Sequence, residues 1–179
     1  MLSLLGRFRR ATDGLAAIEF ALLAPVLAAM FLGTIELSDA LNCQQKVTGL
    51  ASTAADLVAQ DTAISTSDMS NVYSAVNSII YPYATTGLKI VITSLVDNGS
   101  GGGKVAWSCA QNGAARTANS TVTVPSGVIT TGGSVILAEI SYPYSSPVSD
   151  YITGTITMTQ TFYSRPRRTV TVSGPASCP

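Results

Sequence analysis

Two carboxylates, Glu19 and Glu36, lie near the ends of an apolar run that occupies residues 15–37. A run of about twenty apolar residues is long enough for a helix to cross the hydrocarbon core of a membrane. A carboxylate inside such a helix is costly, although less so near an end, so Glu19 needs either water or a cationic partner. Two interpretations follow. Glu19 reaches the cytoplasmic headgroups by snorkelling, or the chain is cut after Gly14 and the new α-ammonium of Leu15 lies at the depth of Glu19.

Basic residues precede the apolar run and are absent from it. Arg7, Arg9 and Arg10 come before the run, and no Lys or Arg follows until Lys46. Positively charged flanks stay on the cytoplasmic side of a membrane helix. We therefore expect a single-pass membrane protein with residues 1–14 in the cytoplasm and the C-terminal domain exported.

The composition disfavours catalysis and nucleic-acid binding. Histidine is absent, which removes the most common general base and the usual zinc ligand. No nucleophile motif such as Gly-x-Ser-x-Gly occurs, and the aspartates lack the alternation of a calcium loop. The formal net charge is zero and 11% of residues are charged, so no basic footprint for nucleic acid exists. We expect no catalytic site, no metal and no cofactor; an exported hydrolase would need carboxylates that converge only in space.

The three cysteines, Cys43, Cys109 and Cys178, are widely spaced and include no C-x-x-C pair. A zinc knuckle and a thioredoxin-like motif are therefore both absent. In an oxidising compartment the simplest arrangement is one disulfide and one spare thiol. Cys109 ends a predicted strand and Cys178 lies in the C-terminal tail, so we expect these two to pair. Cys43 is then free, buried at a helix seam, or paired with another chain.

A single long helix is expected over residues 15–60, of which residues 15–37 form the membrane span. Beyond the span, apolar residues continue at helical spacing, which predicts that the outer part of the helix packs on the exported domain. This stripe consists of Val47, Leu50, Ala51, Ala54, Leu57 and Val58. A second helix is predicted over residues 67–81, with Ser67 or Asp68 as its cap and Pro82 as its stop.

The remainder of the exported domain, residues 61–179, is rich in strand signals between residues 88 and 163, before a C-terminal tail. Five runs of β-branched residues read as strands: 88–96, 103–109, 120–124, 134–144 and 152–162. In the last run Ile152, Ile156, Met158 and Phe162 alternate with threonines, so we expect the apolar set to be buried. The predicted fold is α+β, with the long helix packed at its outer half on a small antiparallel sheet.

Two further sets of residues could form contacts with partners. Ala17, Ala21, Ala24 and Ala28 recur at helical spacing and would allow another helix to approach closely, although alanine is common in any membrane helix. Arg165, Arg167 and Arg168 concentrate three of the ten basic residues near the C-terminus. They protect a strand edge from association, or they form a docking patch for an acidic partner surface.

The N-terminal pattern resembles a known family. The stretch "RFRRATDG" followed by "LAAIEFALLAPVLAAMFLGTIELSDAL" resembles the leader and helix of a class III prepilin, with Glu at the fifth position after Gly14. More narrowly, this pattern, with "AEISYPYSS" and "SRPRR" nearer the C-terminus, resembles the TadE/TadF minor pilins of the bacterial tight-adherence (Tad) pilus.

The resemblance implies a function in assembly. It implies cleavage between Gly14 and Leu15 by a membrane aspartyl prepilin peptidase, with the apolar helix retained in the mature protein. It further implies other pilins and the pilus assembly platform as partners. Glu19 could then neutralise the amino terminus of a neighbouring Leu15 and set the axial register. The alternative is an uncleaved, signal-anchored binding domain in the periplasm or at the surface that never assembles.

Overall fold

The computed structural model describes residues 14–146 and 154–179. The chain divides between Asp39 and Ala40 into two compact units. Most of the predicted leader, and the positions Ile152 and Thr153 of the last predicted strand, lie outside the described residues. The helix predicted over residues 15–60 is observed as α2, Leu15–Ala59, which begins in the first unit and ends in the second.

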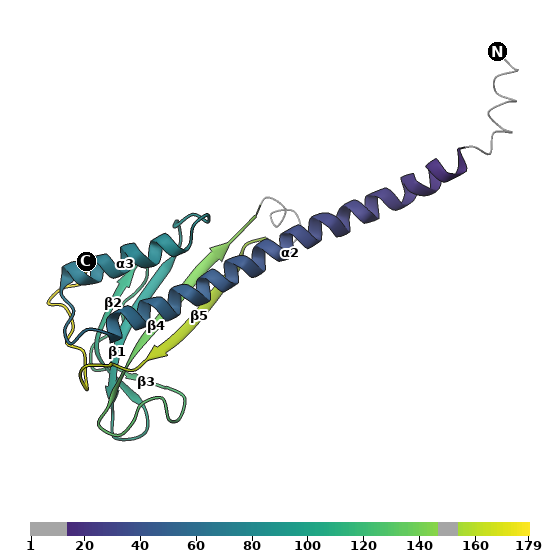
Figure 1. The fold of residues 1–179 in the computed structure, drawn as a ribbon. Coiled ribbons are helices and arrows are strands. Elements are labelled where there is room, and N and C mark those ends of the chain that lie inside the picture. The colour runs from purple at the N-terminus through teal and green to yellow at the C-terminus, as the bar shows by residue number, and fades with distance from the viewer. Residues whose placement is uncertain (1–13, 147–153) are drawn as a thin grey trace, which may run out of the picture. The chain divides into compact units, whose positions relative to one another are not determined.

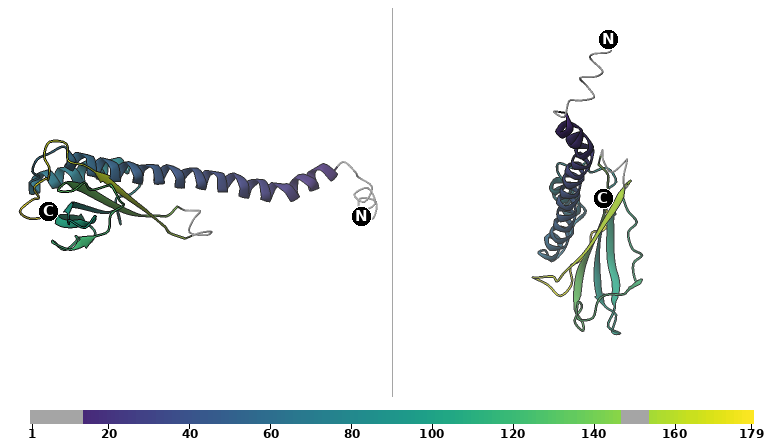
Figure 2. Two further views of the ribbon diagram at one scale, coloured as in Figure 1. Left: turned by 90° about the horizontal axis from the view of Figure 1, so that it is seen from below. Right: turned by 90° about the vertical axis from the view of Figure 1, so that its right-hand side faces the viewer.

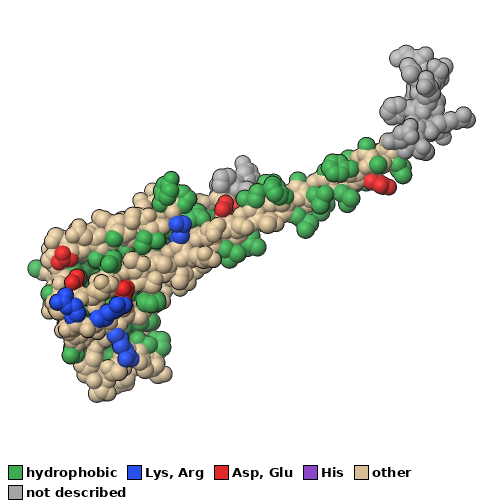
Figure 3. Space-filling model, viewed as in Figure 1, with side chains coloured by type: hydrophobic (Ala, Val, Ile, Leu, Met, Phe, Trp, Pro, Cys, Tyr) green, Lys and Arg blue, Asp and Glu red, His purple; other side chains and the backbone are tan. Residues whose placement is uncertain are grey.

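The part of α2 in the first unit is apolar and uncovered. Large hydrophobic side chains such as Phe20, Leu22 and Met30 are more than half exposed, and Pro25 lies inside the helix without ending it. Figure 3 shows hydrophobic side chains on this segment. By length and composition α2 could cross a membrane, and none of the residues of its apolar window is buried within the described part of the chain. The structure thus supports a single membrane span.

The second unit has two layers, with helices on one face of a sheet (Figures 1 and 2). The helices are α2 from Ala40 onward and α3, Thr66–Ile79. The strands are β1 (Lys89–Asp97), β2 (Gly103–Gln111), β3 (Thr121–Val122), β4 (Ser134–Tyr144) and β5 (Ile156–Ser164). They pair antiparallel in the order β3-β2-β1-β4-β5. The predicted α+β class is confirmed.

The main core lies between the helices and the sheet. The predicted stripe on α2 is buried, except that Leu57 is only partly covered. It meets strand residues such as Ile90, Ile92 and Ile140, all of which lie in the same apolar cluster. The small residues Ala51, Ala54 and Ala55 are buried beside Leu50, so the helix can approach the sheet closely. Burial of this stripe therefore holds the outer half of α2 on the domain.

A smaller apolar cluster covers part of the opposite face of the sheet. Leu95 and Val105 are buried there against Val122, Val124 and other residues of the segment that connects β2 to β4. Because its residues cover this face, the long β2–β4 connection forms a partial third layer, which the sequence pattern did not predict. The β1–β2 register shifts between Ser94 and Leu95.

The start of α3 differs from the prediction. The N-cap is Ser65, not Ser67 or Asp68, and Ser65 and Asp68 form a capping box. The Ser65 hydroxyl accepts the Asp68 N–H at 3.2 Å, and the Asp68 carboxylate accepts the Ser65 N–H at 2.9 Å. The Ser65 hydroxyl also donates to the Asp68 carboxylate at 2.6 Å, and this bond, together with the one from the Ser65 N–H, holds the pKa of Asp68 below its ordinary value. The prediction missed the Ser-x-x-Asp spacing, because two later polar residues also fit a cap.

The expected burial on β5 is wrong for two of its residues. Met158 is buried, as expected, but Ile156 and Phe162 are 42% and 40% exposed. The register places Phe162 opposite Ala138 and Met158 opposite Tyr142, so these side chains face the helix layer. Because β5 is the last strand of the sheet, no further strand covers their outer side. Alternation predicted the face correctly but could not predict the strand's position in the sheet.

We expect Leu50→Ala to lower the free energy of unfolding of the second unit by about 2–5 kcal/mol, the range for removing a fully buried leucine side chain. Urea unfolding of the full chain in detergent micelles, followed by the fluorescence of Trp107, measures the change. Thr48→Ala, at an exposed position of the same helix, is the matched control and should have little effect. Equal effects of the two variants would contradict the assigned packing.

Candidate functional site

The expected processing site lies at the start of α2. Gly14 directly precedes the helix, and its carbonyl accepts the N–H of Ile18 at 3.1 Å. A Cβ at position 14 would meet no atom within 4 Å, and the backbone there is not in the left-handed region. Gly14 is exposed. The fold therefore does not require glycine at this position, so a requirement for glycine would have to come from recognition by another molecule.

Leu15 and Glu19 lie one helical turn apart on exposed surface. Leu15 is 64% exposed, and Glu19 is also exposed. Residues four apart in a helix lie on the same face. Within the described residues, no hydrogen bond or ion pair involves the Glu19 carboxylate. The structure thus presents a carboxylate near the helix start that has no cationic partner among the described residues.

The alanine seam also lies in the uncovered part of α2. Ala17, Ala21 and Ala28 are exposed, and Ala24 is partly covered. These residues belong to the first unit. The role of this seam in helix packing stays a prediction.

The C-terminal tail is attached to the second unit by a disulfide. Cys109 in β2 and Cys178 in the tail, the two cysteines expected to pair, are joined with their Cα atoms 5.4 Å apart and 69 positions apart in sequence. In the chain-entropy model a loop of this length stabilises by about 4 kcal/mol. The bond fixes a tail that has little secondary structure of its own.

Hydrogen bonds hold the same tail along its length. The Trp107 indole N–H donates to the Val172 carbonyl at 2.9 Å, and the backbone of Ser173 exchanges bonds with Thr62 and Ile64. Gly174 lies against the Trp107 ring, where a Cβ would come within 2.3 Å of the indole. The tail is therefore an ordered part of the fold. The close approach of the Trp107 ring requires glycine at position 174.

The structure places the three arginines of the "SRPRR" stretch in different roles. Arg165 donates to the carbonyls of Gly127 and Val128, at 2.7 and 3.2 Å. Arg167 forms an ion pair with Asp56 of α2, and its N–H donates to the Ala59 carbonyl. Arg168 is exposed and has no hydrogen bond or ion pair within the described residues. Two of the three arginines thus attach the segment at the end of β5 to the β2–β4 connection and to α2. Docking of a partner through this stretch stays a prediction.

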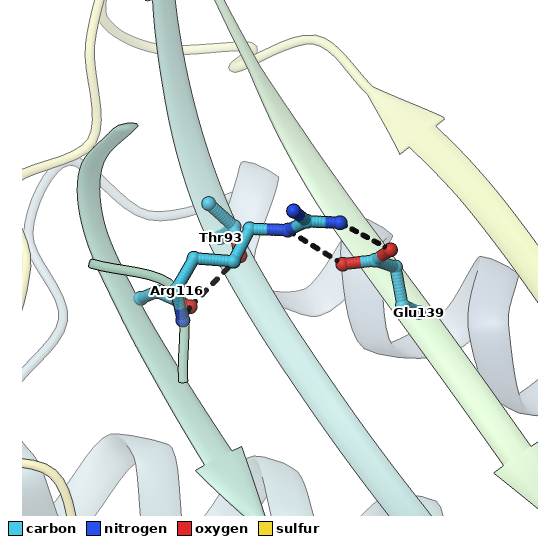
Figure 4. A network of polar contacts seen from close by, with 4 residues as sticks. Thr93, Arg116 and Glu139 are labelled. Carbon is cyan, nitrogen blue, oxygen red and sulfur yellow. Dashed lines mark hydrogen bonds and ion pairs between the residues drawn. The ribbon is translucent and has the colours of Figure 1, made fainter. Parts of the chain in front are cut away.

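An ion pair that the sequence analysis missed lies on the sheet face opposite the helices (Figure 4). Arg116 in the β2–β4 connection makes a bidentate contact with Glu139 of β4, at 2.9 and 2.6 Å. The pair raises the pKa of Arg116. The Arg116 N–H donates to the Ser108 hydroxyl, which bonds Thr93. The signal for this contact was Glu139 itself, a carboxylate inside the apolar strand "SVILAEISYPY".

The Arg116–Glu139 pair lies beside an open groove of about 390 Å³ on the sheet surface. Hydroxyl and amide side chains of β4 and β5 line it, together with the stem of Lys89. Both charges of the ion pair are engaged by each other, and no nucleophile with an adjacent base lies there. Among the described residues, no group of three or more His, Cys, Asp or Glu could hold a metal ion. The pair fixes the connection to the sheet.

Cys43 is the free cysteine of the described chain, and it is fully buried in the main core. Burial raises the pKa of its thiol to about 11, although nearby Lys46 partly offsets this effect. Lys46 itself donates to the carbonyl of Ile79 at the end of α3, at 3.2 Å. Of the states expected for Cys43, the structure shows the free and buried one.

These features define a class of protein: a small disulfide-tied α+β domain on a helix that is apolar and uncovered at its N-terminal end. Residues 14–56 match the family described as TadE-like protein, and the predicted resemblance is thereby confirmed over these residues. The match contains Gly14, Leu15, Glu19 and the alanine seam, and it ends before the sheet. No curated protein and no solved structure matches the chain.

We expect native Cys43 to resist alkylation by iodoacetamide at pH 8. With a pKa of about 11, only about one thiol in a thousand is ionised at that pH, and the thiol is buried as well. Mass spectrometry of the full chain in detergent micelles measures the rate, which should rise to that of an ordinary thiol in denaturant. In a Cys109→Ser variant the released Cys178, which is exposed, should react at once and serves as the control. Equally fast labelling of native Cys43 would contradict its burial.

Proposed function

We propose that this chain is a minor pilin, or pseudopilin-like, subunit for assembly of a Tad-type pilus used in adhesion. The observation that carries the proposal is the match of residues 14–56 to the TadE-like family, which includes the helix segment whose large apolar side chains are exposed within the described part of the chain. A helix with such a surface requires a membrane or other helices around it. The protein acts by assembly and uses no catalytic site.

In this proposal a prepilin peptidase cuts the chain between Gly14 and Leu15. The exposure of both residues, and the absence of any steric need for glycine at position 14, support this assignment. Cleavage before the apolar segment leaves the span in the mature protein, unlike removal of an ordinary signal peptide. The subunit is stored in the inner membrane with its disulfide-tied domain in the periplasm, a compartment in which disulfides persist.

Cleavage creates a positive charge beside the Glu19 carboxylate. The helix start then carries an α-ammonium at Leu15 and, one turn further, a carboxylate that has no partner among the described residues. In the low-dielectric interior of a helix bundle, an arrangement that leaves either charge alone is disfavoured. Glu19 of one subunit therefore pairs with the Leu15 amine of a neighbour and selects one axial register. The alanine seam permits the close helix approach that this pairing needs.

We expect Glu19→Gln to leave cleavage after Gly14 intact but to lower incorporation into pili or their assembly complex by about tenfold. The amide cannot neutralise the amine, and a loss of about 1.4 kcal/mol corresponds to a factor of ten. Immunoblots of membrane and sheared pilus fractions from cells measure both quantities.

Glu36→Gln is the matched control, because it removes the other carboxylate of the same apolar run, far from the new amine. It should be cleaved and incorporated as in the unaltered chain. Normal incorporation of the Glu19→Gln variant would contradict the register role of Glu19.

A further inference from the structure

The groove beside the Arg116–Glu139 pair has the size of a small-ligand site. Its volume is about 390 Å³, and ligand pockets usually measure about 300–1,000 Å³. Strands β1, β4 and β5 line it together with residues 113, 114 and 116 of the β2–β4 connection. All of these residues belong to the second unit. The polar groups in the groove therefore show which ligand chemistry it could take.

The strand register places three polar side chains of the groove in one row. Lys89 of β1 lies opposite Ser141 of β4, and Ser141 lies opposite Thr159 of β5. Residues directly opposite each other have Cβ atoms about 4.5–5.5 Å apart. Among the described residues, no hydrogen bond or ion pair engages the Lys89 ammonium or the two hydroxyls. The row thus offers one uncompensated positive charge and two free hydroxyl groups.

The next row of the groove contains the ion pair. Glu139 lies between Val91 of β1 and Thr161 of β5. Both of its carboxylate oxygens accept from Arg116, at 2.9 and 2.6 Å (Figure 4). A carboxylate has about four acceptor positions and a guanidinium has five N–H donors, so each group can still bind a further partner. Because Arg116 compensates the charge of Glu139, Lys89 leaves the groove with a net positive charge.

The segment that lines one side of the groove is held at both ends. The Asn112 side-chain N–H donates to the carbonyl of Leu88, just before β1, at 3.0 Å. The backbone N–H of Arg116 donates to a hydroxyl of β2, also at 3.0 Å. Between these bonds Gly113 lies close to β1, since a Cβ there would be 3.3 Å from the Val91 side chain. A site that is fixed before binding loses less conformational entropy when a ligand arrives.

These groups favour a ligand that carries both a carboxylate and several hydroxyl groups. The Lys89 ammonium and the unused N–H groups of Arg116 are donors suited to an anion. The free acceptor positions of Glu139 require donors from the ligand, which a simple carboxylate does not have. The hydroxyls of Ser141 and Thr159 can either donate or accept. A sugar acid supplies the anion and the hydroxyl donors within one residue.

We propose that this groove binds an acidic saccharide through a uronic acid residue. The sugar carboxylate pairs with Lys89, and ring hydroxyls of the sugar donate to Glu139. Further ring hydroxyls exchange hydrogen bonds with Ser141 and Thr159. The contacts are partly exposed and each is weak, so selectivity comes from the combination of charge and hydroxyl pattern. The site uses residues of the second unit alone, so the proposal is independent of cleavage after Gly14.

The test uses the full chain in micelles of a polyoxyethylene detergent, which carries neither sugar nor charge, and three matched probes. Trigalacturonic acid has both carboxylates and hydroxyls. Its methyl ester keeps the hydroxyls without the charge, and triaspartate keeps carboxylates without hydroxyls. Calorimetric titration and NMR shifts of the backbone amides measure binding. We expect trigalacturonic acid to bind, with shifts at Gly113, Ser141 and Thr159, and the other two probes to bind at least about tenfold more weakly.

Two matched chain variants each remove one positive charge from the sheet. Lys89→Gln should weaken binding of trigalacturonic acid by about tenfold, because the charge in the groove is lost. Lys104→Gln, at an exposed position of β2 outside the groove, should leave binding unchanged. Thr159→Val removes one hydroxyl and should weaken binding by about threefold, as expected for one neutral hydrogen bond. Unchanged thermal unfolding shows that each variant is folded.

Four results would overturn the proposal. Trigalacturonic acid fails to bind, its methyl ester binds equally well, or Lys104→Gln weakens binding as much as Lys89→Gln does. The third result would show attraction to the charge of the whole surface and not to the groove. If triaspartate binds as tightly as trigalacturonic acid, the occupant is an acidic peptide and the assignment to a saccharide is wrong.

Discussion

The structure depends on the division of one helix between two environments. From Ala40 onward, α2 buries a stripe of small and branched apolar residues against the sheet, with Leu50 and Val58 fully covered. Before Asp39 the same helix exposes large apolar side chains on its surface. Hydrophobic burial is non-directional and scales with area, so the first segment requires cover that the described part of the chain does not supply. The second unit is built on the part of the helix that carries the buried stripe.

The second unit uses several devices to hold a small domain on a single helix. The disulfide and the Trp107–Gly174 contact fix the tail across the sheet, and the Asp56–Arg167 pair joins α2 to the segment after β5. The Arg116–Glu139 contact fixes the long connection on the other face. The two ion pairs are partly exposed, and each contributes little by itself.

Much of the fold was predictable because its signals are local. The length of the apolar run, its continuation as a stripe through Val58, and the β-branched runs specified the helix and the strands. Cys109 and Cys178 could be paired because one ends a strand and the other lies in a tail. The N-terminal family pattern was confirmed because residues 14–56 carry it in contiguous sequence.

Features that depend on spatial order could not be predicted in the same way. The exposure of Ile156 and Phe162 follows from the place of β5 at the border, which strand periodicity does not contain. The partners of Arg165 and Arg167 are remote in sequence. The sequence alone therefore indicated a cluster of unpaired cations at residues 165–168. The candidate site at Gly14 and Glu19 is the opposite case, since its residues lie close together in sequence and only their proposed partners lie outside the described chain.

The central claim is that the chain becomes a pilin-like subunit through cleavage between Gly14 and Leu15. Intact mass and N-terminal sequencing of the protein from native membranes, with and without the prepilin peptidase, tests this most directly. The account predicts a start at Leu15 that depends on the peptidase. A chain that begins at Met1 in both strains would contradict it and would leave a tethered domain, with Glu19 oriented toward the cytoplasmic headgroups.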